Sequence, residues 1–255
     1  MSHFASYPSL SGRVVFVSGG GSGIGASIVE HFAEQGAKVG FVDIDEAASK
    51  ALVEKLGAAG HPAPIFTKCD VRDIAAYQAV LAEVAGKFGA ITVLVNSAAR
   101  DDRHKLEDVT QDFWDERIAV NLRHQYFATQ SVVPGMKAAG GGSIINFSSV
   151  SYRVMTSNLS VYQAAKAAVV GMTRGLARDL GSDKIRLNSI TPGWIMTERQ
   201  INLWLTPEAE ASQMALQCLK EKLYPPDIAR MVLWLAADDS RLVTAQDFVV
   251  DGGRT

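Results

Sequence analysis

Tyr162 and Lys166 are the two residues whose types and spacing most directly suggest chemistry. They lie four positions apart in a helix-forming run, Ser160–Ala168, so their side chains share one helix face. A neighbouring ammonium favours the phenolate. A tyrosine with an ordinary pKa of about 10 needs a shift of roughly three units, or about 4 kcal/mol, to act as a base near neutral pH. One ammonium and a positively charged cofactor could supply this shift. The same pair also fits a surface tyrosine above a lysine on an amphipathic helix, so the rest of the chain must decide.

A glycine-rich turn follows the first expected strand. The β-branched run Arg13–Ser18 leads into Gly19-Gly20-Gly21-Ser22-Gly23-Ile24-Gly25, and a helical pattern then continues to Gln35. The glycines can be read as Gly21-x-Gly23-x-x-Ala26, a dinucleotide-binding fingerprint, or as Gly19-x-x-x-Gly23-x-Gly25. Such a turn lets the backbone approach a pyrophosphate, toward which the helix directs free N–H groups. We therefore expect a dinucleotide site here rather than a flexible surface turn.

Asp43 ends the second expected strand, Lys38–Val42. A carboxylate at this place can accept hydrogen bonds from both ribose hydroxyls of NAD, and it would repel the additional phosphate of NADP. Neither residues 19–25 nor residues 43–46 contain an arginine or a lysine. The sequence therefore predicts NAD as the cofactor. Asp43 could instead cap the following helix.

Strand-like and helical segments alternate along the whole chain. The expected strands cover residues 13–18, 38–42, 65–69, 91–95, 143–147, 185–190 and 248–250. One expected helix runs from the glycine turn to Gln35, a second covers 46–59, and a third follows Asp70 and runs through Val84. The others are one long helix over 112–137 that carries Asn121, the Tyr162 helix, which runs to about Leu180, and a last helix over 227–237. This pattern predicts an α/β fold: a Rossmann-like, doubly wound parallel sheet of about seven strands with helices on both faces. Ligands of such sheets bind at the carboxyl ends of the strands.

Composition favours a small-molecule partner. The 255 residues carry a formal net charge of -2, which suggests neither nucleic acid nor an acidic membrane as partner. No apolar run approaches the roughly 20 residues that span a bilayer, and the N-terminus lacks a basic region followed by an apolar core. The two cysteines, Cys69 and Cys218, lack metal-ligand spacing. We expect a single cytoplasmic domain over residues 1–255, without a bound metal.

The ordered motifs together resemble the short-chain dehydrogenase/reductase superfamily over nearly the whole chain. They comprise the glycine turn from Ser18 to Gly25, then Asn96, Asn121, Ser149, Tyr162, Lys166 and Pro192-Gly193. The resemblance implies four catalytic residues. Ser149 would hold the substrate oxygen, Tyr162 would transfer its proton, Lys166 would lower the tyrosine pKa and bind the nicotinamide ribose, and Asn121 would anchor a proton-relay water. Ser148 is an alternative hydroxyl, although the family's spacing of thirteen positions before Tyr162 selects Ser149.

The same resemblance implies the cofactor contacts and the assembly. The expected contacts are Ser18, Gly19, Ser22, Gly23, Ile24, Gly25, Asp43, Asp70, Val71, Asn96, Ala98, Tyr162, Lys166, Pro192, Gly193, Ile195 and Thr197. Ser18 replaces the family's usual threonine, and Ala99 replaces a glycine, which adds a methyl near the cofactor ribose. A homotetramer is expected to pack through the Asn121 and Tyr162 helices and the C-terminal strand.

A polar block after the fourth strand points to the substrate. Residues 101–106, 113–117 and 121–124 resemble the corresponding parts of bacterial NAD-dependent aldose dehydrogenases, most of all those of the D-xylose 1-dehydrogenase type. Besides Ser149, the candidate sugar contacts are His104, Asn158, Gln163 and Trp194. Alternatively, the loop is simply solvated, or Trp194 belongs to the core. The interrupted segment 194–223 is expected to form a substrate lid.

The sequence thus predicts NAD-dependent oxidation of an aldose at its anomeric carbon to an aldonolactone. D-Xylose, L-arabinose, D-galactose and L-fucose cannot be ranked from these residues. A carbonyl or 3-oxoacyl reductase of the same superfamily is the alternative enzyme, for which NADPH and an apolar or carrier-binding surface would be expected. A non-catalytic dinucleotide sensor is a third hypothesis. It would be expected to lack one of Asn121, Ser149, Tyr162 and Lys166, and all four are present.

Overall fold

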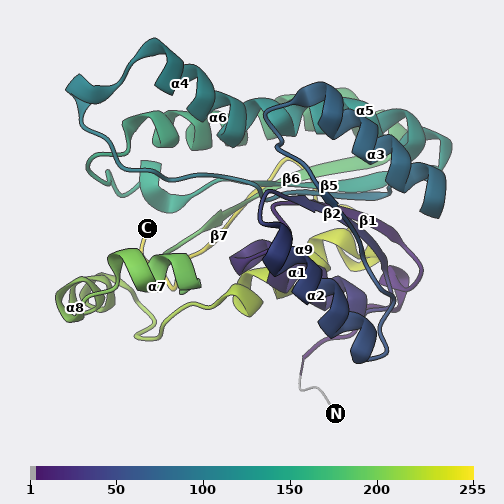
Figure 1. Ribbon diagram of the computed structural model, residues 1–255, viewed down its shortest axis with the longest axis horizontal. Coiled ribbons are helices and arrows are strands. Elements are labelled where there is room, and N and C mark those ends of the chain that lie inside the picture. Colours follow the sequence, from purple (N-terminus) through teal and green to yellow (C-terminus); the bar gives the residue numbers. More distant parts are fainter. Residues whose placement is uncertain (1–3) are drawn as a thin grey trace.

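The computed structural model describes residues 4–255, and its centre is a seven-stranded sheet in the order β3-β2-β1-β4-β5-β6-β7 (Figure 1). All neighbouring strands are parallel. The strands are β1 (Val14–Ser18), β2 (Lys38–Asp43), β3 (Ile65–Lys68), β4 (Val93–Asn96), β5 (Gly142–Phe147), β6 (Ile185–Pro192) and β7 (Asp247–Val250). The order reverses between β1 and β4, which is the switch point where such sheets bind ligands.

Helices cover both faces of the sheet (Figure 1). One face carries α3 (Ile74–Phe88), α4 (Gln111–Ile118), α5 (His124–Ala138) and α6 (Ser160–Leu180); the other carries α1 (Gly23–Glu34), α2 (Glu46–Ala58) and α9 (Pro225–Ala236). Short 3₁₀ turns are η1 (Pro8–Leu10), η2 (Leu106–Asp108), η4 (Val150–Tyr152), η5 (Gly181–Asp183) and η6 (Asp238–Ser240). The predicted doubly wound α/β fold is confirmed.

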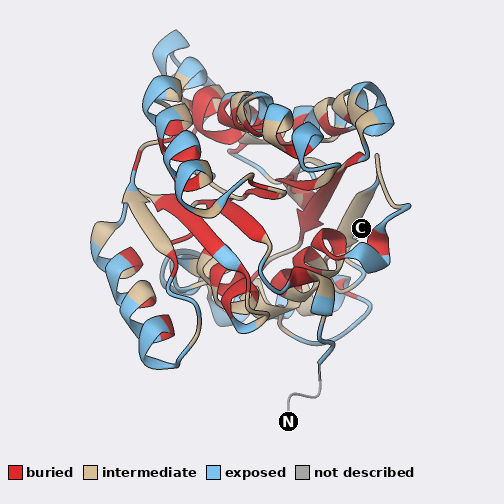
Figure 2. Cartoon of the chain, turned by 90° about the vertical axis from the view of Figure 1, so that its right-hand side faces the viewer, coloured by how far each residue is buried: buried red, intermediate tan, exposed pale blue. Residues whose placement is uncertain are grey.

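Side-chain alternation along the central strands explains the two layers. In β1, Val15 and Val17 pack in the cluster that includes α1 and α9, whereas Val14 and Phe16 pack in the cluster that includes α3 and α5. All five residues of β1 are buried, as Figure 2 shows for the middle of the sheet. Both faces are therefore apolar, so polar groups collect where the strands end.

Two elements differ from the sequence prediction. Strand β6 continues through Pro192, which was expected to lie beyond its end. The proline is tolerated because the pairing of β6 with β5 stops at Ile190, and the last pair, Pro192 with Val250, is made only with β7. The N–H of Gly193 then donates to the Val250 carbonyl at 2.9 Å.

The second difference is a π-helical turn, η3 (Ala119–Arg123), in the predicted long helix 112–137. The Asn121 amide nitrogen donates to the carbonyl of Arg117 at 2.9 Å, and the Gln125 amide nitrogen donates to the carbonyl of Asn121 at 3.1 Å. These side-chain bonds accompany the locally wider helix. Such π-turns are frequent at functional sites, and this one adjoins the cavity described next.

Candidate active site

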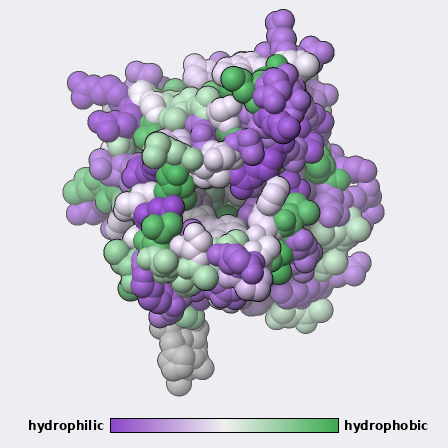
Figure 3. Space-filling view, turned by 90° about the vertical axis from the view of Figure 1, so that its left-hand side faces the viewer, coloured by the Kyte–Doolittle hydropathy of each residue, from purple (hydrophilic) through white to green (hydrophobic). Residues whose placement is uncertain are grey.

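A cavity with a volume of about 1070 Å³ lies along the carboxyl ends of the strands. Figure 3 looks onto this edge of the molecule, where the surface is hollowed. Six strand ends contribute to the wall, as predicted: Gly19 and residues 22–25, 42–45, 69–72, 97–101, 147–151 and 192–195. The segment after β6 closes one side of the cavity with α7 (Glu198–Trp204), and α8 (Pro207–Leu216) follows. Neither α7 nor α8 contains a buried residue.

The glycine turn leaves no room for side chains. Gly19 has φ +69°, and an added Cβ would lie 2.8 Å from the Cα of Ala98. At Gly25 an added Cβ would lie 1.8 Å from the carbonyl oxygen of Gly19. Helix α1 therefore starts directly against the turn, and its first N–H groups face the cavity edge. This cradle fits the pyrophosphate of a dinucleotide.

Asp43 is held in place at the end of β2. The N–H of Gly21 donates to Asp43 Oδ2 at 2.8 Å, and the N–H of Asp45 donates to Asp43 Oδ1 at 2.9 Å. The alternative in which Asp43 caps α2 is wrong, because Asp45 is the cap and accepts from the N–H of Ala48 at 3.0 Å. Asp43 instead lines the cavity, with its carboxylate bonded directly to the glycine turn.

Ser149, Tyr162 and Lys166 meet on the opposite wall. Tyr162 and Lys166 lie one turn apart on α6, with Lys166 Nζ 5.5 Å from the centre of the tyrosine ring. Lys166 Nζ donates to the carbonyl of Phe147 at 2.8 Å, which ties it to the end of β5. The Ser148 hydroxyl donates to the carbonyl of Lys166 at 2.7 Å, whereas the Ser149 hydroxyl accepts from the N–H of Ser151 at 3.2 Å and lowers the pKa of Tyr162. This arrangement favours Ser149 over Ser148 as the reactive hydroxyl.

Burial keeps the phenol and the amine close to neutral in this enclosure. Burial raises the pKa of Tyr162, the Asp101 carboxylate raises it further, and Ser149 and Arg103 lower it. Burial also lowers the pKa of Lys166 to about 7, against the opposing effect of Asp101. Lys166 alone therefore does not make Tyr162 a base at neutral pH, and additional positive charge is needed beside it.

Asn121 lies behind this wall and does not line the cavity. Its Oδ1 accepts from the N–H of Arg100 at 2.9 Å, and its amide nitrogen donates to the carbonyl of Arg100 at 3.1 Å. Asn121 thus ties the loop after β4 to the π-turn. In this structure its side chain positions Arg100 and the following loop.

The remaining expected cofactor residues divide into two groups. Those on the cavity wall, beyond the residues already described, are Ser22, Gly23, Ile24, Asp70, Val71, Ala98, Pro192, Gly193, Ile195 and Thr197. Ser18 and Asn96 are fully buried behind it. The Ser18 hydroxyl accepts from the N–H groups of Ser97 and Ala98 at 3.1 and 3.2 Å, so the serine supports the loop that faces the cofactor site.

Of the expected sugar contacts other than Ser149, only Trp194 lies on the wall. The His104 ring packs on Phe113, and its Nε2 lies 3.2 Å from the Ser160 hydroxyl. The Gln163 amide nitrogen donates to the carbonyls of Ser151 and Thr156 at 2.9 and 2.7 Å.

Asn158 is exposed, with φ +58°, and its carbonyl accepts from the N–H of His104 at 2.9 Å. His104 and Gln163 thus brace the loops around the cavity, because nearby groups take their side-chain hydrogen bonds, and Asn158 contributes only its backbone carbonyl to this bracing.

Several wall residues were not singled out from the sequence as contacts: Asp101, Arg103, Arg199 and Gln200. Asp101 and Arg103 belong to the polar block 101–106, from which only His104 was chosen as a contact. Arg199 and Gln200 reach Asp101 from 98 and 99 positions away. The only sequence signal for these wall residues is the high density of charged side chains in residues 101–105.

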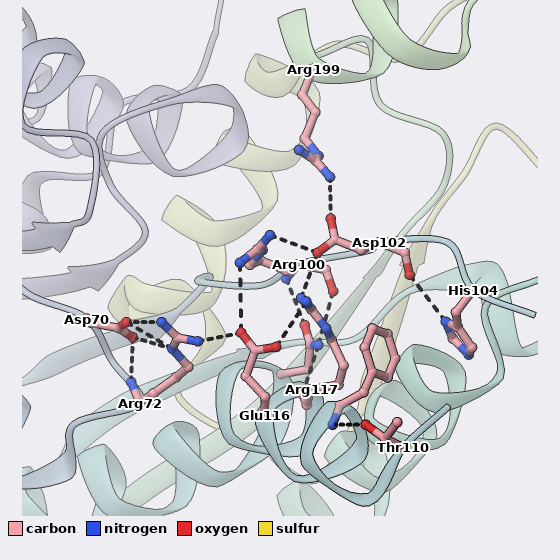
Figure 4. A network of polar contacts seen from close by, with 11 residues as sticks. Asp70, Arg72, Arg100, Asp102, His104, Thr110, Glu116, Arg117 and Arg199 are labelled. Atoms are coloured by element: carbon pink, nitrogen blue, oxygen red, sulfur yellow. Dashed lines mark hydrogen bonds and ion pairs between the residues drawn. The ribbon is translucent and has the colours of Figure 1, made fainter. Parts of the chain in front are cut away.

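A charge network supports the same loop (Figure 4). Asp102 forms ion pairs with Arg117 at 2.7 Å, Arg100 at 2.9 Å and Arg199 at 2.9 Å. Arg117 is 8% exposed and has a second partner in Glu116, which also pairs with Arg72 beside Asp70. The buried cation is therefore neutralised, and the loop after β4 is joined to the residues after β3.

Comparison with known proteins identifies the family. A family model described as enoyl-(acyl carrier protein) reductase matches residues 19–255. The chain is 49% identical over 249 residues to a D-xylose 1-dehydrogenase of Caulobacter vibrioides, covering 98% of each chain. This chain belongs to the short-chain dehydrogenase/reductase superfamily. As in that superfamily, it is a dehydrogenase, an oxidoreductase acting on CH–OH groups.

Two further proteins of the superfamily are similar to this chain, one in sequence and one in structure. A probable galactose dehydrogenase of Rhizobium meliloti is 49% identical over 247 residues, covering 97% of this chain and 96% of that one. The crystal structure of a 3-oxoacyl-[acyl-carrier protein] reductase from Brucella melitensis matches with a TM-score of 0.90 at 30% identity, covering 99% of this chain and 97% of that one. The aldose dehydrogenases are thus considerably more similar in sequence.

The described helices include none that is long and apolar enough to cross a membrane. Among residues 4–255, no three His, Cys, Asp or Glu side chains group in a way that could hold a metal ion.

Proposed function

We propose that this dehydrogenase oxidises the anomeric carbon of an aldose to an aldonolactone with NAD. The observation that carries the proposal is one cavity with Ser149, Tyr162 and Lys166 on one wall and a fixed Asp43 beside the glycine cradle on the other. The similarity to D-xylose and galactose dehydrogenases supports an aldose as the substrate class.

Asp43 supports NAD over NADP. Each carboxylate oxygen accepts one backbone N–H and keeps a further lone pair, so both oxygens can still accept a ribose hydroxyl. A 2′-phosphate at the same place would meet a negative charge that cannot turn away. No lysine or arginine from the glycine turn or from residues 43–46 compensates for this charge.

The chain's own residues would move the proton of the reacting hydroxyl. Ser149 would hold the oxygen, and the Tyr162 phenolate would accept its proton. Bound NAD supplies a hydride acceptor, and its cationic ring contributes positive charge beside Tyr162. Lys166 would add to that charge and bind the nicotinamide ribose. Asn121 would act from behind the wall, by holding Arg100 and the loop after β4 in place. General base catalysis of this kind contributes about 10²- to 10⁴-fold.

Three further parts of the expectation remain proposals. Residues 194–223 act as a lid, and limited proteolysis tests this: NAD plus aldose slows cleavage between Trp194 and Leu223, and equal cleavage rates with and without them would contradict it.

An apolar groove packs against a second copy within a homotetramer. It is formed by Ile118, Leu122, Arg123, Tyr126, Phe127, Ala168 and Met172. Light scattering that finds a monomer would contradict this assembly. A cytoplasmic location is tested by cell fractionation.

Absorbance of the reduced cofactor tests the function most simply. Purified protein is mixed with NAD or NADP and a panel of D-xylose, L-arabinose, D-galactose, L-fucose and hydroxy acids. Turnover of at least one aldose with NAD is expected. The matched family model and the Brucella structure favour acyl reduction as the second candidate. Turnover of a 3-oxoacyl thioester with NADPH, in the absence of any aldose oxidation, would replace the first proposal with the second.

A further inference from the structure

Asp101 lies on the cavity wall beside the catalytic residues, and the proton transfer does not use it. It comes from the loop after β4, and its side chain is 21% exposed. Its charge raises the pKa of both Tyr162 and Lys166, which line the same cavity. A carboxylate in this position costs desolvation free energy, so it is expected to have a use.

Only part of the hydrogen-bonding capacity of Asp101 is taken. Oδ1 accepts from Arg199 Nε at 3.2 Å, and Oδ2 accepts from Gln200 Nε2 at 3.0 Å. An ionised carboxylate offers about four lone-pair positions, so about two stay available on the cavity side. Such a carboxylate accepts hydroxyl donors and has no donor of its own.

The partners of Asp101 come from α7, the helix over the substrate end of the cavity. Gln200 also accepts from Trp194 Nε1 at 2.9 Å, so the same side chain holds the apolar wall. Nearby, the Arg103 guanidinium lies 4.9 Å from the centre of the Trp204 ring. Asp101 is thus the point where the loop after β4, α7 and the cavity interior meet.

We propose that Asp101 is a specificity-determining residue that accepts a hydrogen bond from the substrate hydroxyl on the carbon next to the reacting one. With its other lone pairs it keeps α7 over the site. In an aldose the neighbouring hydroxyl is the donor nearest to the oxygen held by Ser149 and Tyr162, and Asp101 lines the same cavity as both catalytic groups. The proposal rests on the proposed function and names the feature that the substrate must carry.

A comparison of D-galactose with 2-deoxy-D-galactose tests the proposal, with NAD in excess. The wild-type protein should prefer D-galactose in kcat/KM by about 10- to 100-fold, as expected for a hydrogen bond to a charged group. In Asp101→Ala this preference should fall to within about threefold, because the hydroxyl has lost its charged acceptor. The KM for NAD should not change. Asp101→Asn, which keeps the size and one acceptor oxygen, should lose part of the preference.

Two control variants separate this role from a structural one. Arg199→Gln keeps the carboxylate and removes one of its two partners on α7, so it should slow both sugars by the same factor and keep the preference. Asp102→Asn removes the same charge one residue away, where the carboxylate faces Arg100, Arg117 and Arg199, and it should also keep the preference.

The outcomes are distinct. If Asp101→Ala slows both sugars equally while its thermal stability and NAD affinity are unchanged, the assigned hydrogen bond is wrong. If the wild-type protein oxidises no aldose at all, the proposed function fails first. If it oxidises D-galactose and 2-deoxy-D-galactose equally well, the proposed function stands and only the role of Asp101 is overturned.

Discussion

Replacing Asp43 by asparagine should shift the cofactor preference from NAD toward NADP. Asparagine has nearly the same shape, but only one oxygen remains to accept, and its NH₂ group would face the N–H of either Gly21 or Asp45, which Asp43 now satisfies. The variant loses the negative charge and one of the fixed acceptors together. The overall fold should be retained because Asp43 is only partly buried, at the end of its strand.

The magnitude follows from two contributions. Hydrogen bonds to a charged acceptor are worth about 1.5–3 kcal/mol and neutral ones about 0.5–1.5 kcal/mol, so NAD should bind about 10-fold more weakly. Two unit charges 4 Å apart at an effective dielectric constant of 20 repel by about 4 kcal/mol, which is an upper limit because solvent screens the rim. Relief of a part of this repulsion should raise kcat/KM for NADP by about 10- to 100-fold. The NAD-to-NADP preference should therefore fall by at least about 100-fold.

The assay is the initial rate of reduced-cofactor formation with each dinucleotide at saturating aldose. Asp45→Asn is the matched control, since it removes the same charge two residues away and asparagine still caps α2. The control should change the preference by no more than about threefold. If Asp43→Asn keeps the wild-type preference, or if Asp45→Asn shifts it equally, the account of cofactor choice by Asp43 is refuted.

The remaining predictions concern pH and the glycine cradle. Tyr162 faces the charges of Asp101, Arg103 and Lys166; Asp101 raises its pKa and Arg103 lowers it. Oxidation needs the phenolate, so the rise of kcat/KM with pH should move to lower pH in Asp101→Asn and to higher pH in Arg103→Gln, measured from pH–rate profiles. Shifts in the same direction, or none, would contradict this electrostatic assignment. Gly25→Ala should abolish measurable NAD binding by calorimetry, because the new Cβ would lie 1.8 Å from the backbone carbonyl oxygen of Gly19 and the turn has to move. Gly57→Ala in α2, where an added Cβ meets nothing within 4 Å, should keep NAD binding and raise the free energy of unfolding by about 0.5–1 kcal/mol. Full NAD affinity in Gly25→Ala would show that the turn tolerates a side chain.

Local sequence patterns were sufficient for the fold because each strand and helix has its own signal. Val14–Val17 and Val39–Val42 are continuously apolar, and each is followed by a polar residue, as expected for strands covered on both faces. The glycine turn was visible because its spacing is set by backbone geometry. The π-turn at Asn121 was not visible, because side-chain hydrogen bonds accompany it and helical periodicity does not reveal it.

The cavity wall was only partly visible in the sequence. Asp101 receives its partners from Arg199 and Gln200, far away along the chain, and no short-range pattern announces such a meeting. His104 and Gln163 had the right chemistry for sugar contacts, but nearby groups take their hydrogen bonds. Polar residues in a loop near a site can serve the loop or the ligand, and only the folded geometry distinguishes the two.

Tyr162 is proposed to be the base for oxidation of an aldose, and the substitution Tyr162→Phe tests this role most directly. The variant removes one oxygen from a partly buried ring and leaves the glycine cradle and Asp43 untouched. We expect the NAD dissociation constant, measured by fluorescence titration, to stay within about threefold of the wild type, while kcat with the best aldose falls by about 10²-fold or more. Retention of substantial turnover with unchanged NAD binding would contradict the account.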